Sequence, residues 1–347
     1  MKTTLANVTG KIDWLQILFY QVPLEEILSH LMMIDVTCFT IEEAKVKHKD
    51  YDLAYVYGDI RVYTTELDTL SETYLVLSGE GCTLFERLLE NLGETWKTFF
   101  KKLFLEYMGH FKVKRVDLAL DDKNEKPFFQ VEQLIKKCKK GQFNSSGRTY
   151  RLNESKFLGN KTAKTLYIGV RTSDVMFRIY EKDKEQAIKQ DIAIEEIGSW
   201  KRTEVEVKNE IAESIIRIIA FSDDSLENTI RGFIKKELVF YSTSEMQEVA
   251  RFWKSYLGKA KALEIEKLYE VTGLHETERW LEFGGAIGAI KAFQFLSEHR
   301  ALGELKDVQD MLADVEYPRA LSNKLVSHLI NIGRDDLVKE VYANTKK

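Results

Sequence analysis

Apolar and polar residues alternate with a period of two along several short segments in the first part of the chain. The alternation is clearest in RVDLALDD, VMFRIYEK and KRTEVEVK, which are residues 115–122, 175–182 and 201–208. Because side chains point alternately to the two faces of a strand, each segment is expected to be a strand with one apolar and one polar face. Further strands are indicated at residues 11–20 and 73–79, and a hairpin is indicated at residues 53–65.

Segments with the helical period lie between these strands. The longest is residues 84–108, which we expect to bend or break near Gly93. Shorter helices are indicated at residues 23–32 and at residues 130–141, the second of which ends at a glycine.

The pattern changes near Glu245, beyond which it is wholly helical and carries no strand signal. We therefore predict an α+β fold, in which an antiparallel-sheet domain with an open polar sheet face covers residues 1–245. A helical C-terminal region is expected to cover residues 246–347.

Parity along the three clearest strands sorts their side chains into two faces. The apolar face carries Val116, Leu118, Leu120, Val175, Phe177, Ile179, Thr203, Val205 and Val207. The opposite face carries Arg115, Asp117, Ala119, Asp121, Met176, Arg178, Tyr180, Lys182, Arg202, Glu204, Glu206 and Lys208. The ordinary cause of such alternation is an antiparallel sheet with one side in water.

Carboxylates on separate strands of this polar face suggest a metal site. Asp117 and Glu204 would converge from two strands, and Glu206 or Asp121 would complete the set. Oxygen ligands of this kind suit a hard divalent cation, Mg²⁺ or Mn²⁺.

A tyrosine on the same face is a candidate nucleophile toward a phosphodiester. Tyr180 has Arg178 and Lys182 two residues to either side, on its own face of the strand. An unperturbed tyrosine has a pKa of about 10, so attack at neutral pH needs cations that stabilise the phenolate and hold the phosphate.

The 347 residues carry a net charge of −4, which argues against a protein that coats nucleic acid over its whole surface. A basic segment nevertheless runs from Lys136 to Lys164, with Glu154 as its one acid. Its cations are Lys136, Lys137, Lys139, Lys140, Arg148, Arg151, Lys156, Lys161 and Lys164. It is expected to contact DNA phosphates or, alternatively, to be a solvated helix end followed by a flexible loop.

Other features place the chain in the cytoplasm. No apolar run of about 18 residues occurs, so a membrane span is not expected. Cys38, Cys82 and Cys138 are widely spaced and form no zinc motif, which fits a reducing compartment.

The chain resembles the trans-acting rolling-circle replication initiators of Gram-positive plasmids and their relatives, the relaxases of conjugative elements. The residues that carry the resemblance are KIDWLQILF, RVDLALDD, TLYIGVRTSDVMFRIYEKDKEQ and WKRTEVEVK, in that order. The resemblance implies that Tyr180 is the nucleophile and that the acidic metal ligands lie on the strands of Asp117 and Glu204. It also implies a nick that leaves a 5′-phosphotyrosine and a free 3′-hydroxyl, followed by rejoining of the strand.

A second β-hairpin is indicated at residues 164–183, and Arg171 lies near its turn. The implied partner is origin DNA, as a single strand or an extruded DNA hairpin, with Arg171 and the polar-face residue Arg115 among its contacts. The helical region would recognise the origin, form a homodimer or receive a host helicase, and the sequence does not rank these roles. Two other functions stay open: a sequence-specific DNA-binding protein without catalysis, and a metal-dependent nuclease that uses water.

Overall fold

The structure is a computed structural model of the chain. It describes residues 3–44, 51–65, 72–147, 149–156, 162–264, 286–300, 303, 306–313, 315–331 and 334–346. Two of the predicted DNA contacts, Arg148 and Lys161, lie outside these residues. The chain divides into two compact units, Met1–Ile265 and Glu266–Lys347.

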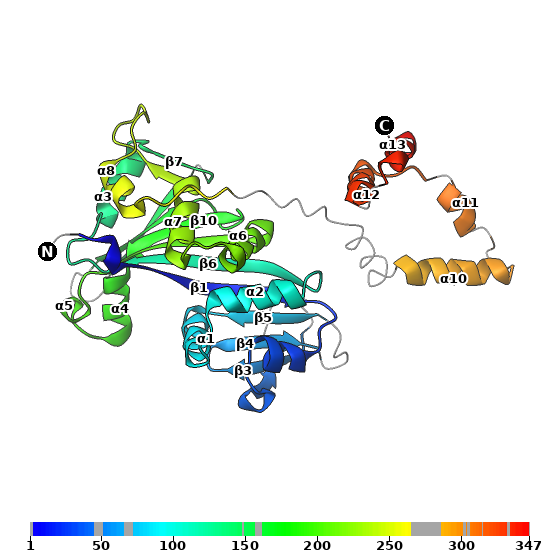
Figure 1. Ribbon diagram of the computed structural model, residues 1–347, viewed down its shortest axis with the longest axis horizontal. Helices are drawn as coiled ribbons and strands as arrows, with labels where there is room; N and C mark the ends of the chain where they lie inside the picture. The colour runs from blue at the N-terminus through cyan, green and yellow to red at the C-terminus, as the bar shows by residue number, and fades with distance from the viewer. Residues whose placement is uncertain are drawn as a thin grey trace. The chain divides into compact units, whose positions relative to one another are not determined.

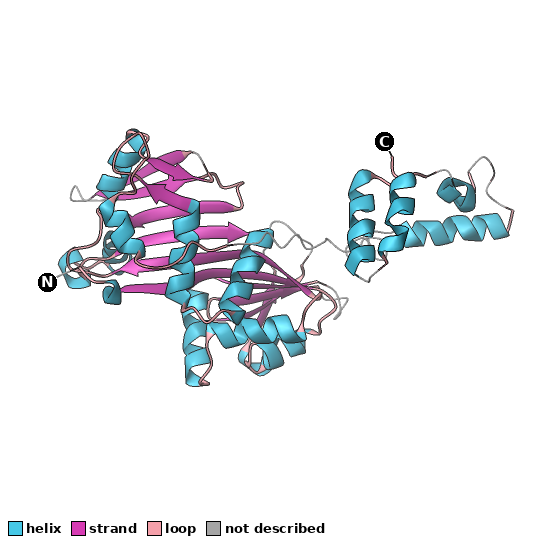
Figure 2. Ribbon diagram, turned by 45° about the horizontal axis from the view of Figure 1, so that its top comes forward, coloured by secondary structure: helices cyan, strands magenta, loops and turns pink. Residues whose placement is uncertain are grey.

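The first unit is built on a ten-stranded sheet with the order β2-β3-β4-β5-β1-β6-β11-β10-β9-β8. The registered strand pairs of this sheet are antiparallel, and Figure 2 shows the strands side by side with helices lying across them. The strands are β1 (Val8–Phe19), β2 (Thr40–Glu43), β3 (Leu53–Tyr57), β4 (Ile60–Thr64), β5 (Thr73–Leu77), β6 (Phe111–Asp122), β8 (Tyr150–Lys156), β9 (Thr162–Ile168), β10 (Val175–Glu181) and β11 (Lys201–Lys208). A second, two-stranded sheet pairs β7 (Phe143–Ser145) with β12 (Leu238–Phe240). The predicted α+β fold with a large antiparallel sheet is confirmed.

The helices of the first unit are α1 (Gly79–Asn91), α2 (Trp96–Glu106), α3 (Val131–Lys139), α4 (Lys182–Gln190), α5 (Ile194–Ile197), α6 (Asn209–Phe221), α7 (Leu226–Glu237) and α8 (Arg251–Leu257). Short 3₁₀ turns cover Leu5–Asn7 and Val36–Cys38. Helices α6 and α7 pack on β6 and on its neighbours β11 and β1, and α3 packs on β9 and β10 (Figure 1).

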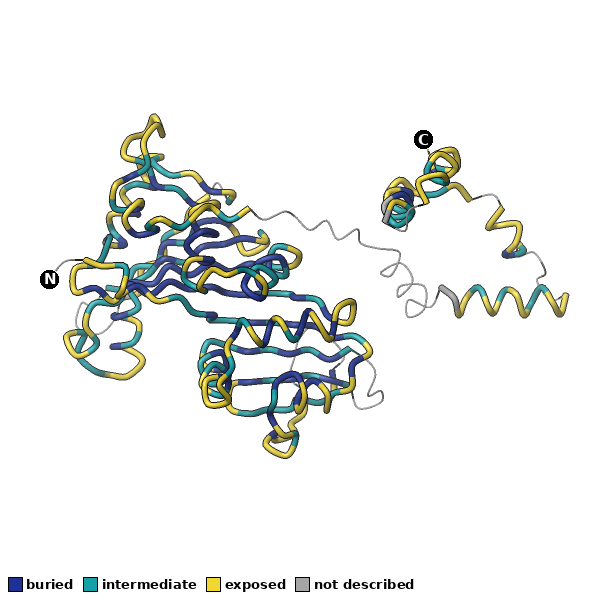
Figure 3. The backbone as a smooth tube through the Cα atoms, viewed as in Figure 1, coloured by how far each residue is buried: buried dark blue, intermediate teal, exposed yellow. Residues whose placement is uncertain are grey.

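The helix-covered face holds the core, because the apolar parity positions lie there. Val116, Leu118 and Leu120 of β6 are fully buried and belong to one hydrophobic cluster with Ile215 and Ile219 of α6. Figure 3 shows the central strands as the most deeply buried part of the unit. The chain returns across the sheet without a loop, since α6 begins at the residue that follows β11.

The predicted break near Gly93 is confirmed. Gly93 has a φ of +73°, in the left-handed region that favours glycine, and it separates α1 from α2. Thr95 then caps α2, since its side chain accepts a hydrogen bond from the Thr98 backbone amide at 3.3 Å.

Three predicted elements differ from the structure. The segment at residues 23–32 forms a π-helix, Glu26–Leu31, instead of an α-helix. The basic stretch, for which a flexible loop is the alternative to a DNA-contacting surface, contains the edge strand β8, which pairs with β9 along its full length. The predicted boundary near Glu245 lies inside the first unit, because α8 packs into that unit's core.

The second unit is helical among its described residues. Its elements are α10 (Ala286–Glu298), α11 (Val308–Ala313), α12 (Arg319–Asn331), a 3₁₀ turn (Asp335–Leu337) and α13 (Val338–Ala343). Several large apolar side chains of this unit are exposed, among them Phe295, Leu312 and Ile330. Across the described residues of both units, no helix combines the length and the apolar character that a membrane crossing requires.

A substitution of Trp253 in α8 tests whether this helix belongs to the first unit. Its side chain is fully buried, packs edge-on against Phe240 and donates from Nε1 to the Leu238 carbonyl oxygen at 3.1 Å. Replacing a buried tryptophan by alanine costs about 3–5 kcal/mol, so Trp253→Ala should lower the free energy of unfolding in urea by that amount. Phe295→Ala, at a residue 58% exposed in the second unit, is the control and should change it little. An equally small effect of Trp253→Ala would show that α8 does not belong to the folded core of the first unit.

Candidate active site

Cross-strand register brings the predicted polar residues of β6, β11 and β10 onto one face. Asp117 of β6 lies opposite Glu206 of β11, and Glu204 lies opposite Arg178 of β10. One step along the strands, Asp121, Arg202 and Tyr180 form a third row. Asp117, Glu204 and Tyr180 therefore share one face of the sheet, as the alternation in the sequence predicts.

The polar face is not in water at its centre. Asp117 and Glu204 are 1% and 3% exposed, and Asp121 and Arg202 are each 3% exposed. Burying a charge costs several kcal/mol unless a partner compensates it. The ordinary explanation of the alternation, a solvated sheet side, therefore does not apply to these residues.

Arg115 compensates two of the buried acids. Its Nε and Nη2 donate to the two carboxylate oxygens of Asp117 at 2.7 and 2.6 Å, which is a bidentate pair. Nη2 also lies 2.9 Å from Glu206 Oε2, and Lys208 pairs with the other oxygen of Glu206 at 2.9 Å. The guanidinium stacks on Trp14, 4.8 Å from the ring centroid. Arg115, predicted as a DNA contact, is thus part of the site's framework.

Arg178 joins Asp117 to Glu204. Its Nη2 lies 3.0 Å from Asp117 Oδ2 and makes a short contact with Glu204 Oε1. The other oxygen of Glu204, Oε2, accepts a hydrogen bond of 3.1 Å from the Tyr180 hydroxyl. A continuous chain of contacts therefore runs from Asp117 through Arg178 and Glu204 to the phenol.

Arg202 holds the third row together. It is bidentate to Asp121, at 2.7 and 2.8 Å, and its Nη1 donates to Asp13 Oδ1 at 2.8 Å. Asp13 lies in a β-bulge of β1, where the register against β6 shifts between Ile12 and Trp14.

Sequence reasoning missed Asp13, although a signal was present. The apolar positions Ile12 and Leu15 are three residues apart, which breaks the period of two within one strand. A bulge restores the pattern and turns both Asp13 and Trp14 toward the polar face.

Lys182 lies beside Tyr180, but on a helix and not on the strand where the sequence predicts it. The strand ends at Glu181, and Lys182 is the first residue of α4. Its ammonium lies 5.5 Å from the centroid of the Tyr180 ring and pairs with Glu185 at 2.7 Å. Within the described residues, neither Lys182 nor Arg178 hydrogen-bonds the phenol oxygen.

Burial raises the pKa of three acidic groups in the site, Tyr180, Glu204 and Asp117. Burial raises the pKa of Tyr180, and the nearby Glu204 charge raises it further. Burial also raises the pKa of Glu204 from 4.5 to about 7, against the lowering effect of Arg178. The pKa of Asp117 is raised by burial as well, against the opposing effect of Arg115. The tyrosine is therefore a phenol at rest, with a carboxylate of near-neutral pKa as its hydrogen-bond acceptor.

The side chains surround a pocket of about 330 Å³ that is open to one side of the sheet. Its lining comprises Asp13, Trp14, Gly79, Arg115, Asp117, Thr165, Tyr167, Arg178, Tyr180, Lys182, Glu185 and Glu204. Gly79 belongs to the first turn of α1, so that helix borders the pocket. The described residues contain no group of three or more acidic, histidine or cysteine side chains arranged to hold a metal ion.

The predicted DNA contacts divide between the two faces of the sheet. Arg151 on β8 lies opposite Tyr167, with its guanidinium carbon 4.7 Å from that ring, and so belongs to the polar face. The lysines of α3 lie on the other side, because α3 packs on the apolar side of β9 and β10. Arg171 is exposed in the turn between β9 and β10, where its carbonyl oxygen accepts a hydrogen bond from Lys208.

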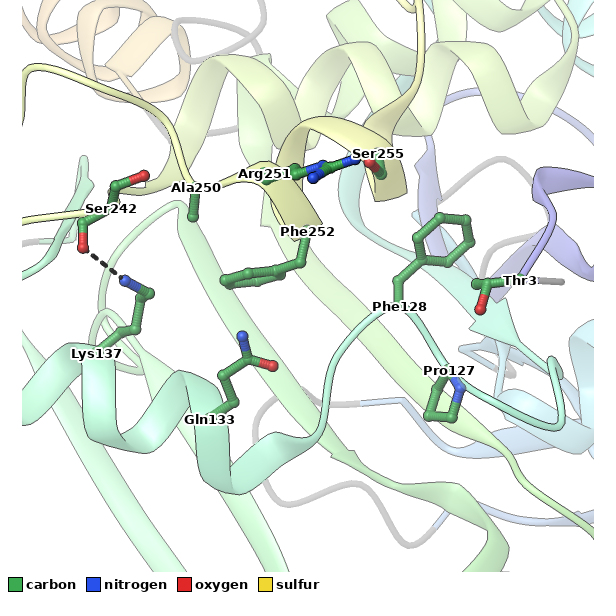
Figure 4. Close-up of a pocket in the computed structure, with 10 residues that line it drawn as sticks. All are labelled: Thr3, Pro127, Phe128, Gln133, Lys137, Ser242, Ala250, Arg251, Phe252 and Ser255. Atoms are coloured by element: carbon green, nitrogen blue, oxygen red, sulfur yellow. Dashed lines mark hydrogen bonds between the residues drawn. The ribbon is translucent and has the colours of Figure 1, made fainter.

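Lys137 and its neighbours line a groove on that opposite side (Figure 4). The Lys137 ammonium donates to the carbonyl oxygens of Tyr241 and Ser242 and to the side chain of Gln142. Lys136, Lys139 and Lys140 are exposed. The structure thus does not bring the α3 lysines together with Tyr180.

Two sequence families match the chain. The family described as "Replication initiation factor" matches residues 111–305, and the one described as "Rolling Circle replication initiation protein N-terminal domain" matches residues 9–102. The first match covers more than half of the chain, which therefore belongs to the replication initiation factor family.

Two individual proteins are similar over most of the chain. A putative DNA relaxase NicK from Bacillus subtilis (strain 168) is 28% identical over 318 residues, which are 89% of this chain and 86% of the relative. The solved structure of a rolling circle replication initiator protein from Geobacillus stearothermophilus superposes with a TM-score of 0.61 at 25% identity. The superposition covers 75% of this chain and 99% of that one.

The raised pKa of Glu204 predicts a pH dependence of stability. A carboxyl whose pKa is higher in the folded than in the unfolded state stabilises the fold at low pH, and that contribution is lost as pH rises through the folded value. Between about pH 5 and about pH 8 the wild type should therefore lose stability relative to Glu204→Gln, which cannot titrate. Urea titrations of both proteins in EDTA measure the difference. Parallel stability curves would show that Glu204 is ionised throughout this range.

Proposed function

We propose that this chain is a DNA-nicking and strand-transfer endonuclease that starts rolling-circle replication or conjugative transfer. The observation that carries the proposal is the Tyr180 hydroxyl, which donates to the buried Glu204 inside a pocket on a sheet face that Arg115 and Arg178 also line. Membership of the replication initiation factor family supports it. Similarity to a putative DNA relaxase and to a rolling circle replication initiator points the same way.

Tyr180 is the proposed nucleophile. Its oxygen would form a bond to the scissile phosphorus as the bond from phosphorus to the 3′ oxygen breaks, which yields a 5′-phosphotyrosine and a 3′-hydroxyl. The phenol proton would pass to Glu204 Oε2, the oxygen that already accepts its hydrogen bond, and the leaving 3′ oxygen would take up one proton, from Glu204 or from water. Because the phosphodiester energy is kept in the phosphotyrosyl bond, the 3′-hydroxyl can reverse the reaction without ATP.

The cations of the pocket would stabilise the charge that develops on the phosphate. The Arg178 side chain is 30% exposed and the Arg115 side chain 21%, whereas the acids they contact are almost fully buried. Each arginine therefore has donors at the mouth of the pocket, where a phosphate would bind. Lys182, also in the lining, supplies a third positive charge beside the phenol.

A divalent cation, Mg²⁺ or Mn²⁺, is part of the proposal, and Asp117 and Glu204 are the residues that would hold it. When bound, it would polarise the scissile phosphate and neutralise developing charge. The fit rests on Arg178, whose Nη2 lies between oxygens of Asp117 and Glu204, so that a positive group already occupies the space between these carboxylates. The donor set is all oxygen, as these cations prefer.

The other two predicted ligands fit less well. Asp117 and Glu204 line the pocket, whereas neither Asp121 nor Glu206 is among its described lining residues. Asp121 is held by Arg202, and Glu206 is held between Arg115 and Lys208. We therefore assign them to the framework that positions Asp117 and Glu204.

The proposed partner is origin DNA, with the scissile strand lying on the polar face past Arg151 and Arg171. Origin recognition, dimer formation and binding of a host helicase are assigned as alternatives to the second unit, which exposes large apolar side chains. A cytoplasmic location fits the three cysteines, all of which are free.

A covalent adduct tests the nucleophile. Wild-type protein incubated with labelled single-stranded origin DNA and Mg²⁺ should give a product that survives denaturation and maps to Tyr180 by peptide digestion. Tyr180→Phe should give none, while its binding of the same DNA should stay within about twofold, since only one hydroxyl is lost. Tyr167→Phe, on the same face one strand away, is the matched control. An adduct formed by Tyr180→Phe would show that another residue is the nucleophile. Cleavage by the wild type without any adduct would show that water is the nucleophile.

Removal of Arg178 tests the metal assignment. In Arg178→Gln the carboxylates of Asp117 and Glu204 lose their shared cation, so we expect tighter Mn²⁺ binding by calorimetry, by about tenfold or more. The Tm in EDTA should fall, and Mn²⁺ should restore it. Arg151→Gln, on the same face but with no carboxylate contact among the described residues, should leave both values unchanged. Equal Mn²⁺ affinity in Arg178→Gln and the wild type would place the metal elsewhere.

A further inference from the structure

A groove on the helix-covered side of the sheet has the features of a second ligand site. Its volume is about 680 Å³, within the range of about 300–1,000 Å³ that ligand sites occupy. It lies between α3 and α8 and is lined by Thr3, Pro127, Phe128, Gln133, Lys137, Ser242, Ala250, Arg251, Phe252 and Ser255 (Figure 4). Since α3 packs on the apolar side of β9 and β10, the groove and Tyr180 are on opposite sides of the sheet.

Two aromatic rings form the apolar part of the groove. The Phe128 ring packs on Tyr256 with centroids 5.8 Å apart, and the Phe252 ring packs on Trp253 at 6.4 Å. Tyr256 and Trp253 are fully buried, whereas Phe128 and Phe252 are half-buried and turn their remaining surface into the groove. The rings are thus held from behind by the core and are available in front.

The polar part of the groove is positively charged. Lys137 and Arg251 line it, and none of its described lining residues is acidic. The Lys137 ammonium is bound by three neutral oxygen acceptors, so no carboxylate cancels its charge. Arg251 is exposed and has no ion pair or hydrogen bond from its side chain within the described residues.

More cations continue the positive surface along α3. Lys136, Lys139 and Lys140 are exposed, and none of them forms an ion pair in the described part of the chain. Glu132, the acid of that helix, is neutralised by Lys164 at 2.5 Å. A ligand in the groove therefore meets cations on both walls, and the ligand's own charge must be negative.

We propose that this groove binds a segment of single-stranded DNA, separate from the segment at Tyr180. Unstacked bases can lie on the faces of Phe128 and Phe252 while Arg251 and the α3 lysines contact the phosphates, which is how single strands are bound without sequence preference. A duplex would offer its phosphates but no free base faces to the rings. Polyglutamate would match the charge but has no flat group for the two rings. The groove site rests on the proposed DNA-nicking function of the chain, but it does not depend on the assignment of Tyr180 as the nucleophile.

The charge of the groove is tested with a fluorescein-labelled oligothymidylate and the full chain, by anisotropy at several salt concentrations. Lys140→Ala/Arg251→Ala should weaken binding about tenfold and reduce the slope of log affinity against log salt by about 1.4, since it removes two phosphate contacts and each contact to a single strand contributes about 0.7. Lys101→Ala, an exposed lysine on α2, is the control and should change neither. An unchanged affinity and slope in the double variant would overturn the proposal.

The aromatic contribution is tested by Phe252→Leu, which keeps an apolar side chain against Phe240 and Trp253. With the Tm unchanged, its affinity for the oligothymidylate should fall about fivefold or more, because base stacking on the ring is lost. Duplex of the same length and polyglutamate should both compete weakly. Competition by either as strong as that of the unlabelled oligothymidylate would overturn the assignment to a single strand.

A variant background keeps this test apart from that of the nucleophile. In Tyr180→Phe the loss caused by Lys140→Ala/Arg251→Ala should be the same fold as in the wild type, because the two sites lie on opposite sides of the sheet. Absence of a Tyr180 adduct would therefore refute the nucleophile and leave the groove result intact. A loss that disappears in the Tyr180→Phe background would refute the groove as a separate site.

Discussion

The buried ion pairs between β6, β11 and β10 are the constraint on which the rest of the site depends. Five acids face four cations across these strands and the bulge of β1: Asp13, Asp117, Asp121, Glu204 and Glu206 against Arg115, Arg178, Arg202 and Lys208. Slipping one strand by one residue would move its charges into the apolar core, at a cost of several kcal/mol per ion. The network therefore fixes the register, and the register places the phenol beside its carboxylate.

The parts of this arrangement that follow from local pattern could be predicted. Alternation in β6, β10 and β11 is enough to assign Asp117, Glu204 and Tyr180 to one face, because parity is a property of a single strand. The break at Gly93 and the hairpin of β9 and β10 follow in the same way from residues adjacent in sequence. The two flanking cations make Tyr180 a candidate nucleophile, and the resemblance to a family implies the same role.

The remaining features depend on contacts between distant segments. Arg202 and Asp13 are 189 residues apart in the chain, and nothing local to either shows that they meet. Strand β8 was missed because YRLNESK is polar at an edge of the sheet, where one side of the backbone needs no partner strand. The α3 lysines and Arg171 were predicted to form one DNA-contacting surface, because they lie close together in the sequence. Helix α3 packs on the apolar side of β9 and β10, however, so its lysines lie on the side of the sheet opposite Tyr180.

Tyr180 lies near the end of β10, an interior strand of the sheet, and this position determines whether the protein or the DNA must move during the proposed reaction. Its backbone is paired with Arg202 on one side and Thr165 on the other. The helix that follows is anchored through Asp183, which binds the buried Lys201 at 2.6 Å. A nucleophile held this way cannot move far, so in the proposed reaction the scissile strand has to be brought to the phenol and not the phenol to the strand.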